Sequence, residues 1–431
     1  FLAPLVPSHG ALPLPRLQPH ARTSAPSRPV VQPVASLVVG VAGWCQQRHQ
    51  RRGSGAASVL RALSALVVGG TGRVGGSTTR WLKKLSLENN LELELSVGGR
   101  KEENYKSFAE GWSNGTVPQF VQIDHTDEGS INRALSLKPW DLVLHTAGPF
   151  QRVKEPKILK EALRLGLPYV DVCDDTDLCK VAKDLSGTAV NSKVPAVVSA
   201  GIWPGVSALM VCEAHERLGD VKDLTMSFYT AGTGGAGPTI VSATFLLLAE
   251  PPLNYKDGEE VREEAWGSRR CVDFGDGVGE QPVHLLDEPE VYTCHEYLGI
   301  PNVSSSFGTA PDVWNWMFAA CAKAIPPSVL ANRSLMQQVA VFSMPIITAV
   351  DRLVGSTNAM HIDATNAAGT KVTLRMTHRD LEDCVGLATA AFGLEVLEGK
   401  VKPGVWFPVE MASNRSQIFE RVKHGSIFWD L

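Results

Sequence analysis

The sequence predicts an α/β fold in which a doubly wound parallel sheet is joined to a second, α+β domain. Two observations carry this prediction. From residue 63 to residue 205, short apolar runs alternate with segments of helical pattern, which is the order that builds a parallel sheet with helices on both faces. From residue 206 onward, strand-like and helix-like segments mix without that regular order, which is typical of an α+β domain.

The first sheet should contain six strands, the usual number for a dinucleotide-binding domain. They are predicted at 65–68, 93–97, 120–123, 141–145, 169–172 and 196–200, with helices near 74–85, 101–111, 128–136, 154–165 and 176–185. In such a sheet the ligand lies beyond the carboxyl ends of the strands. We therefore expect the binding residues of this domain, residues 63–205, to follow its strands directly.

The second domain is assigned to residues 206–380. Leu224, Met226 and Phe228 alternate with polar neighbours, which indicates a strand with one buried face. Further strands are predicted near 271–274, 283–286 and 303–308, with a hairpin from 360–365 to 371–377 and helices near 239–249, 311–324 and 328–342. The polar, glycine-rich stretch 254–280 is expected to be a surface excursion. Residues 381–431 are expected to form C-terminal helices, the first near 381–397, that pack back on the first domain.

The bulk composition argues against several classes of protein. With 44% hydrophobic and 20% charged residues, the chain of 431 residues suits a globular protein with a sizeable core. A net charge of −4 gives no reason to expect nucleic acid as a partner. The apolar run 339–350 falls short of the roughly 20 residues that a membrane span needs, so no span is expected. Scattered cysteines and histidines predict reduced thiols rather than a disulfide framework, and no metal site.

Residues 1–62 differ in kind from the rest of the chain. They carry several arginines, many prolines, serines and alanines, and no Asp, Glu or Lys. Such a leader is typical of an organelle transit segment, so we expect a chloroplast location, with the mitochondrion as the alternative. A disordered tail without an address is the competing interpretation. Because the sequence begins with Phe1, we also expect further residues upstream.

The strongest motif is a glycine-rich turn with Gly-x-Gly-x-x-Gly spacing between the first predicted strand and helix. Gly70 allows a sharp turn, Gly72 lets a pyrophosphate approach the backbone, and Gly75 lets the helix pack closely on the strand. Free N–H groups and the positive end of the helix dipole then face the phosphates. The predicted cofactor-binding turn consists of Gly70, Thr71, Gly72, Arg73, Val74 and Gly75.

Cations follow the second predicted strand, where Arg100 and Lys101 come directly after two glycines. A site that prefers NAD(H) usually holds an acid here for the ribose hydroxyls, whereas a cation can pair with a 2′-phosphate. NADP(H) is therefore favoured over NAD(H), and a solvated charge pair at a helix start is the alternative. Asp124 follows the third strand, where it could accept a hydrogen bond from the adenine amino group or cap the next helix.

The fourth strand runs into a short stretch of mostly small residues. Such residues let a flat cofactor lie against the backbone, so we place this run beside the nicotinamide ribose. A simple turn is the alternative. The run consists of Ala147, Gly148, Pro149 and Phe150.

Carboxylates gather where the fifth strand ends. Asp171 and Asp174 could handle a proton or grip an amine, which makes them the candidate catalytic residues. They could also belong to an N-cap cluster for the following helix. Trp203 lies in a Trp-Pro-Gly bend after the sixth strand, where it could cover the substrate or the nicotinamide, or pack against the second domain.

A second glycine-rich turn again separates a strand from a helix, and Pro238 stands where a phosphate loop would have its lysine. Its backbone N–H groups could bind a substrate carboxylate, and a purely structural turn is the alternative. The candidate substrate residues are Gly232, Gly234 and Gly237. Nearby aromatic residues, Trp314, Trp316 and Phe318, are more typical of a core or a subunit interface, and a homodimer is one arrangement that they allow.

Taken together, these motifs resemble the saccharopine dehydrogenase-like family, and the pattern is most similar to plastid-type proteins of plants and algae. The matching segments are 67–75, 98–100, 146–150, 169–172, 201–205, 230–239 and 404–410. The resemblance implies a Rossmann domain, a second α/β domain and NAD(P)-linked chemistry at a carbon–nitrogen bond. Trp203 stands where the true saccharopine enzymes usually carry an aspartate, which argues against saccharopine itself as the substrate.

The sequence therefore predicts an NADP(H)-dependent oxidoreductase that acts on a small molecule, at a C–N bond of an amino acid or imine. Such a protein holds two carbons close, excludes water and moves one proton. The alternative is a non-catalytic NADP(H)-binding or sensing protein, which would keep the phosphate turn and lack a working proton donor.

Overall fold

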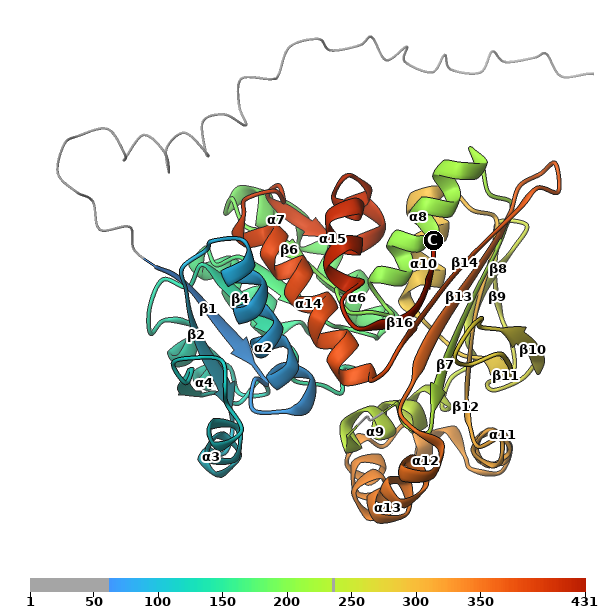
Figure 1. The fold of residues 1–431 in the computed structure, drawn as a ribbon, viewed down its shortest axis with the longest axis horizontal. Helices are drawn as coiled ribbons and strands as arrows, with labels where there is room; N and C mark the ends of the chain where they lie inside the picture. Colours follow the sequence, from blue (N-terminus) through green and yellow to red (C-terminus); the bar gives the residue numbers. More distant parts are fainter. Residues whose placement is uncertain (1–61, 235–236) are drawn as a thin grey trace, which may run out of the picture. The chain divides into compact units, whose positions relative to one another are not determined.

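The computed structural model describes residues 62–234 and 237–431. These residues belong to one compact unit, drawn in colour in Figure 1. The predicted leader, apart from Ala62, lies outside the described residues, so its interpretation as a transit segment stays a prediction.

The first sheet has seven parallel strands in the order β15-β6-β5-β4-β1-β2-β3 (Figure 1). The prediction of a doubly wound sheet is confirmed, and all six predicted strands are present. The strands are β1 (Leu63–Val68), β2 (Leu93–Gly99), β3 (Gln119–Gln122), β4 (Leu142–His145), β5 (Tyr169–Asp171), β6 (Pro195–Val197) and β15 (Gly404–Trp406). The helices are α2 (Arg73–Glu88), α3 (Glu102–Glu110), α4 (Glu128–Leu135), α5 (Lys157–Leu165), α6 (Thr176–Asp184) and α7 (Ser186–Asn191).

The apolar runs form strands because helices cover both faces of this sheet. Leu66 and Val67 are neighbours that point to opposite faces of β1, and both are fully buried. A strand buried on both faces reads as a continuous apolar run rather than an alternating one. The short helix α7 and strand β15 were not predicted, since segments this short carry little periodicity.

The second sheet is mixed and has nine strands, with the main order β10-β11-β12-β7-β13-β14-β16. β7 pairs with β12 in parallel, and every other described pair is antiparallel. The strands are β7 (Asp223–Ala231), β8 (Leu253–Lys256), β9 (Glu259–Arg262), β10 (Arg270–Asp273), β11 (Glu280–Leu285), β12 (Asn302–Ala310), β13 (Asn358–Thr365), β14 (Lys371–His378) and β16 (Ser426–Asp430). The associated helices are α8 (Val206–Leu218), α9 (Pro238–Leu247), α10 (Pro289–Leu298), α11 (Val313–Ala324), α12 (Pro327–Leu330) and α13 (Arg333–Val354).

The stretch 254–280 corrects one expectation, because it holds β8, β9 and β10 rather than an irregular excursion. Each of these strands has four residues. β10 corresponds to the strand predicted near 271–274. The apolar content of β8 and β9 is too low for a pattern-based prediction, and pairing with neighbouring strands supplies the stabilisation that their local sequence lacks.

Residues 381–431 hold more than helices, which is a second correction. Helix α14 (Leu381–Leu397) lies along α2 (Figure 1), and a Cβ at Gly386 would come within 2.6 Å of the Thr78 nitrogen. The close approach of the two helices therefore requires glycine at this position. The chain then adds β15 to the first sheet and β16 to the second, with the 3-10 helix η1 (Pro408–Asn414) and α15 (Arg415–Val422) between them.

Within the described part of the chain, no helix has the length and apolar character to cross a membrane. No group of three or more His, Cys, Asp or Glu side chains there is arranged to hold a metal ion. The seven cysteines of these residues are free, and five of them are buried.

Candidate functional site

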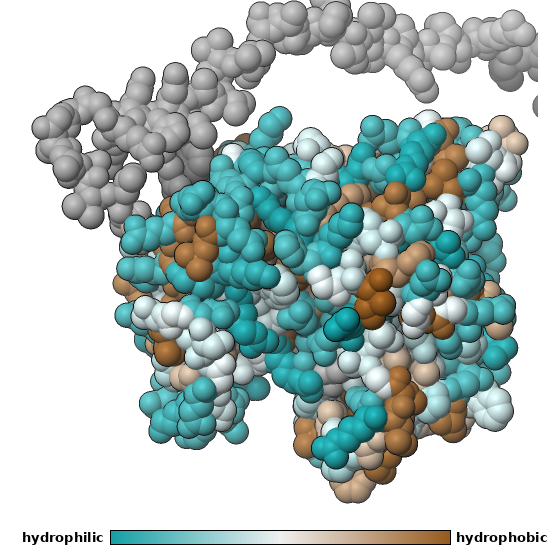
Figure 2. Space-filling model, in the orientation of Figure 1, coloured by the Kyte–Doolittle hydropathy of each residue, from teal (hydrophilic) through white to brown (hydrophobic). Residues whose placement is uncertain are grey.

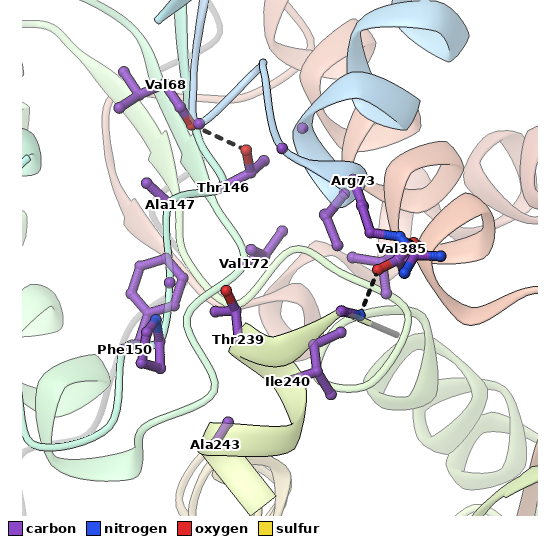
Figure 3. A pocket seen from close by; sticks show the side chains of 18 of the residues that line it. Val68, Arg73, Thr146, Ala147, Phe150, Val172, Thr239, Ile240, Ala243 and Val385 are labelled. Carbon is purple, nitrogen blue, oxygen red and sulfur yellow. Dashed lines mark hydrogen bonds and ion pairs between the residues drawn. The ribbon is translucent and has the colours of Figure 1, made fainter. Parts of the chain in front are cut away.

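A cavity of about 510 Å³ lies beyond the carboxyl ends of β1, β2 and β4, and we call it the first cavity. Residues of the glycine-rich turn line one side, and residues of α9 and α14 close the other. Figure 3 shows Thr239, Ile240 and Ala243 of α9 across the cavity from Ala147 and Phe150. The first cavity is therefore built where the two sheets and their helices meet, at the edge that sequence analysis indicated.

Each glycine of the first turn has its own reason to be glycine. Gly69 takes the left-handed conformation with φ of +85°, which glycine adopts without strain. A Cβ at Gly75 would overlap the Gly69 carbonyl oxygen, so the helix can approach the turn only without one. Gly70 does not line the cavity, and a Cβ there would lie 2.7 Å from the Val67 oxygen. Gly70 lies in the predicted sharp turn, where its nitrogen donates to the Val67 oxygen at 3.0 Å, and it serves the turn and its packing rather than lining the cavity.

Among the glycines of the first turn that line the first cavity, Gly72 is the least crowded. A Cβ at this position would meet only the Gly69 oxygen, at 3.1 Å. Gly72 is also the N-cap of α2, and it has no side chain with which to bond the first turn of the helix. The N–H groups of Arg73, Val74 and Gly75 have no partner within the helix, and all three residues line the cavity.

The helix α2 therefore presents bare donors and the positive end of its dipole to the first cavity. Thr71 lines the same wall. This geometry suits a phosphate group, because a backbone cradle donates several hydrogen bonds without a side chain in the way.

Arg100 and Lys101 line the first cavity next to Gly99 and Thr71. They bring positive charge to the end of the cavity that lies beyond β2. Asp124 does not line it: its carboxylate accepts hydrogen bonds from the Thr126 nitrogen at 2.9 Å and the Thr126 hydroxyl at 2.7 Å. The backbone and side-chain hydrogen bonds from Thr126 lower the pKa of Asp124.

Asp124 is thus a local turn residue rather than an adenine acceptor, which corrects its predicted role. The helix-cap alternative is also wrong for this residue, since Asp127 is the N-cap of α4 and accepts from the Ser130 nitrogen. Ile123 and His125, on either side of Asp124, are the residues that line the cavity.

The predicted nicotinamide strip lines the first cavity along its whole length: Ala147, Gly148, Pro149 and Phe150. The Thr146 hydroxyl donates to the Val68 oxygen at 2.9 Å, which ties the end of β4 to the end of β1 (Figure 3). Arg333 of α13 donates to the Pro149 oxygen at 2.7 Å. The strip is thereby held from both sides.

Asp171 and Asp174 have different surroundings although they are three positions apart. The buried Asp171 carboxylate accepts hydrogen bonds from the Ser199 nitrogen at 2.9 Å, the Cys173 nitrogen at 3.1 Å and the Tyr169 hydroxyl at 2.9 Å. Burial raises its pKa to about 6, while these hydrogen bonds oppose that rise. Asp171 lines neither cavity described here. Its role is structural, which corrects its assignment as a catalytic residue.

Asp174 lies open to the site instead. It lines the first cavity, and its buried Oδ1 has no hydrogen-bond partner. Burial raises the pKa of Asp174 to about 7, and the charges of Asp175 and Asp171 add to the rise. The helix-cap alternative applies to Asp175, which caps α6 by accepting from the Leu178 nitrogen. A hydrogen bond from the Gln151 side chain opposes the rise in the pKa of Asp174, but one carboxyl oxygen of Asp174 has no partner, and the group can change protonation state near neutral pH.

The second glycine-rich turn does not offer an anion site among its described residues. Gly232 and Gly234 have φ of +58° and +65°, and their N–H groups bond to the Ala310 and Ala231 oxygens. The Thr233 nitrogen donates to Asp351 at 3.0 Å. The protein's own acceptors therefore use the donors that we expected to hold a substrate carboxylate, which corrects that prediction.

Gly237, at the other end of this turn, lines the first cavity, and Gly232 lines a second cavity described below. The Gly237 nitrogen donates to Glu382 at 2.8 Å, and the same carboxylate binds the Arg73 Nε at 2.6 Å. Glu382 thus connects the two glycine-rich turns. Burial raises its pKa to about 7 against the opposing charge of Arg73.

Sequence analysis missed Glu382, because a single acid in the first turn of a helix is an ordinary feature. It acquires a function only through contacts with Arg73 and Gly237, which are more than a hundred residues away in the chain. No local signal could have identified it.

A second cavity, of about 500 Å³, adjoins the first. The two share five lining residues: Asp174, Trp203, Ile240, Ala243 and Leu381. Trp203 stacks on Phe228 of β7 with ring centroids 5.1 Å apart. It therefore packs against the second sheet, as one predicted alternative has it, and also lines both cavities. Its role in covering the substrate or the nicotinamide stays a prediction.

Comparison with known proteins supports the fold. No protein-family model matches the chain, and no curated protein sequence matches it. Apo saccharopine dehydrogenase (L-Glu forming) from Saccharomyces cerevisiae has a similar structure, with a TM-score of 0.56 and 14% identity over 84% of this chain and 97% of that one. A myo-inositol dehydrogenase from Corynebacterium glutamicum matches with a TM-score of 0.40 and 12% identity, over 85% and 99% of the two chains.

The chain therefore has the fold of saccharopine dehydrogenase, and the predicted resemblance is confirmed at the level of the fold. Its similarity to plastid-type proteins stays a prediction.

Proposed function

We propose that this protein is an NADP(H)-dependent oxidoreductase that transfers hydride to or from a carbon bonded to nitrogen. The observation that carries the proposal is the first cavity, in which an open helix N-terminus and an unpartnered carboxyl face one space. A dehydrogenase with the same fold adds support for the reaction class, while the substrate has to be argued from the site itself.

The residues of the first cavity fit a dinucleotide. A side chain at Gly72 would fill the space in front of α2, so the absence of one leaves a cradle for a diphosphate. The mostly small residues Ala147 and Gly148 leave a bare strip farther along the same cavity, where a flat ring can lie. When bound, the dinucleotide supplies or accepts a hydride at its nicotinamide ring.

Preference for NADP(H) follows from the charges beyond β2. Arg100 and Lys101 line the cavity there, and Asp124 keeps its carboxylate on Thr126. A guanidinium can bind a 2′-phosphate with paired hydrogen bonds. A ribose 2′-hydroxyl, by contrast, would meet no carboxylate there, because neither Glu102 nor Glu103, which follow Lys101, lines the first cavity.

Asp174 is the proton-handling residue in this proposal. Its carboxyl titrates at about pH 7, which is the range where one group can both give and take a proton efficiently. In the direction of reduction, the carbon of a C=N bond gains the hydride and Asp174 gives its proton to the nitrogen, so the double bond becomes a single bond. In the reverse direction, the ionised Asp174 takes that proton from the amine.

The test measures cofactor binding and turnover separately. NADPH fluorescence would be titrated against the wild type and Gly72→Trp, and NADPH oxidation would be followed with amines mixed with aldehydes or oxo acids. Turnover supports the oxidoreductase, and tight binding without turnover supports a non-catalytic sensor. Equal NADPH affinity of the two proteins would show that the first cavity is not the cofactor site.

We also propose a chloroplast location, which rests on the composition of residues 1–62 alone. A fusion of these residues to a fluorescent protein tests it in plant cells. Fluorescence in mitochondria would favour the alternative location. Fluorescence in the cytosol would overturn both the chloroplast and the mitochondrial location.

A further inference from the structure

We infer that the substrate is an apolar molecule with a single nitrogen-bearing polar head, and that its apolar part occupies the second cavity. This inference rests on the proposed function, because the head must meet the cofactor at the junction of the two cavities.

The walls of the second cavity are its first supporting observation. They come from β7, β12 and the helices α9, α11 and α13, and they consist mainly of aromatic and aliphatic side chains. Representative members are Phe245, Phe307, Trp314, Met317, Phe318 and Met336. A volume of about 500 Å³ with such walls is typical of a site for a drug-sized apolar ligand.

The charges around the second cavity exclude an acidic substrate. None of its described lining residues is Lys, Arg or His. A free carboxylate brought into an apolar cavity without a cation loses its hydration and gains no partner. The α-carboxylate of an amino acid would meet that penalty here, so the expectation of an amino-acid substrate gives way to one without a carboxylate.

The polar end of the cavity is the second supporting observation. Three buried polar atoms there have no hydrogen-bond partner: Asp174 Oδ1, Glu288 Oε2 and Trp203 Nε1. Asp174 and Trp203 line both cavities, and Glu288 lines the second. Buried polar groups are costly when unpaired, so a ligand that bonds them gains binding free energy. An amine nitrogen can donate to the two carboxyls and, when neutral, accept from the indole.

The acidic pair also explains why nitrogen suits this end. Burial raises the pKa of Glu288 well above its usual range, and the charges of Glu290 and Asp174 add to that rise. A cationic amine next to these groups would reverse the effect, since an opposite charge favours the ionised carboxylate. An alcohol head would lack that gain.

The outer end of the cavity is apolar as well. Val339 and Ile346 of α13 both line the cavity and are exposed to 36% and 61%. Phe342, on the same helix between them, is 86% exposed. In Figure 2 brown side chains gather over the part of the molecule where Figure 1 places α12 and α13. An apolar tail can therefore reach the cavity along an apolar rim, whereas a charged one gains nothing from it.

The experiment uses the protein saturated with NADPH and a series of unbranched alkylamines from butylamine to decylamine. Binding is followed by tryptophan fluorescence, since Trp203 and Trp314 line the cavity. Turnover is measured with the matching aldehydes and methylamine. We expect affinity and kcat/KM to rise about threefold for each methylene until the cavity is full, as burial of one methylene allows.

Ser343→Phe shortens the second cavity from α13, and Val341→Phe is the matched control, since Val341 lies on the same helix but does not line the cavity. The first variant should weaken decylamine binding about tenfold and butylamine binding hardly at all, with NADPH affinity unchanged. Ile346→Glu is a second variant, at an exposed position of the rim where a charge can be tolerated. It should also lower the affinity for decylamine.

The outcomes separate the two proposals. Affinity that does not depend on chain length, or equal losses in Ser343→Phe and Val341→Phe, would overturn the apolar substrate. Turnover of oxo acids with amines and none with alkyl substrates would overturn it while leaving the oxidoreductase standing. Length-dependent binding of amines without any NADPH oxidation would instead overturn the proposed function and leave an apolar amine as the ligand of this cavity.

Discussion

The two glycine-rich turns of this molecule share a place in the chain, between a strand and a helix, and differ in what becomes of their backbone donors. At the first turn, Gly72 caps α2 without a side chain, and the donors of the first helical turn face a cavity. At the second, Asp351 binds Thr233 and Glu382 binds Gly237. Pro238 also removes one N–H from the first turn of α9.

The difference shows that a turn is a binding site only when the rest of the fold leaves its donors free. Asp171 and Asp174 repeat the contrast in side chains. The Asp171 carboxylate accepts hydrogen bonds from three protein donors, whereas one carboxyl oxygen of Asp174 has no partner. Of the two acids, only Asp174, the one with an unpartnered oxygen, lines a cavity.

Gly72→Trp tests the first glycine-rich turn directly and should have the largest effect of the variants proposed here, a loss of NADPH affinity. The indole would occupy the space in front of α2, so NADPH affinity should fall at least about a thousandfold, on the order of 4 kcal/mol. Fluorescence titration measures the loss. Gly187→Trp is the control, because a Cβ at Gly187 meets no atom within 4 Å. If both variants bind NADPH like the wild type, the first turn is not the phosphate site.

Asp174→Asn and Asp171→Asn sharpen the contrast between the two acids. Loss of a proton-transfer group typically costs about a hundredfold or more in rate, so the first variant should fold normally and lose kcat. The second should lose stability, on the order of 1–3 kcal/mol, because buried donors lose their acceptor. Steady-state kinetics and urea unfolding separate these effects. Full activity in Asp174→Asn would contradict our assignment.

Asp351→Ala tests the second glycine-rich turn, whose described donors bond to acceptors of the protein itself. Removing the carboxylate deletes the hydrogen bonds that the Thr233 nitrogen and hydroxyl donate to Asp351, so the free energy of unfolding should fall on the order of 1–3 kcal/mol. NADPH affinity should stay unchanged, because neither Asp351 nor Thr233 lines the first cavity. Thermal unfolding and NADPH titration of one preparation measure both quantities. A tighter complex with carboxylate substrates in this variant would show that the turn is a latent anion site.

Arg100→Ala tests the cation next to the open turn. NADPH affinity should fall about tenfold, which is roughly 1.4 kcal/mol, while NADH affinity should hardly change, since only the 2′-phosphate needs the guanidinium. Lys106→Ala is the control, because Lys106 lies on α3 but does not line the cavity. Equal losses for both cofactors would assign Arg100 to adenine or to folding instead.

The pH dependence of stability should give the smallest effect. Asp174 and Glu382 have pKa values of about 7 in the folded protein, above the roughly 4 expected of unfolded carboxyls. The folded state therefore binds more protons between these values. The resulting stabilisation is complete below pH 4 and is lost as the pH rises through 7. The Tm of Asp174→Asn should thus fall less than that of the wild type between pH 5 and pH 8.

Local patterns in the sequence predicted much of the first sheet and the open turn. Leu66 and Val67 belong to an apolar run that only a doubly covered strand can bury, and the glycine spacing around Gly72 has a mechanical cause. The residues that decide the rest act over long distances. Glu382 bonds to Gly237, 145 positions away, and β15 is recognisable as a strand only beside β6.

The second cavity could not have been predicted for the same reason. Its walls come from segments on either side of β12, and each apolar residue in them looks like ordinary core. Trp314 packs against the hydrophobic core, as expected, and also lines this cavity. Trp316 is 67% exposed, and a homodimer stays a prediction.

The last two strands of the chain, β15 and β16, each complete one sheet, and this has a consequence for protein synthesis. β15 pairs with β6, and β16 pairs with β14, so both of these earlier strands keep an open edge until residues 404–430 have left the ribosome. An open strand edge invites pairing with other chains. The nascent protein should therefore depend on chaperones late in translation, and a premature stop near residue 400 should yield aggregates rather than a smaller folded enzyme.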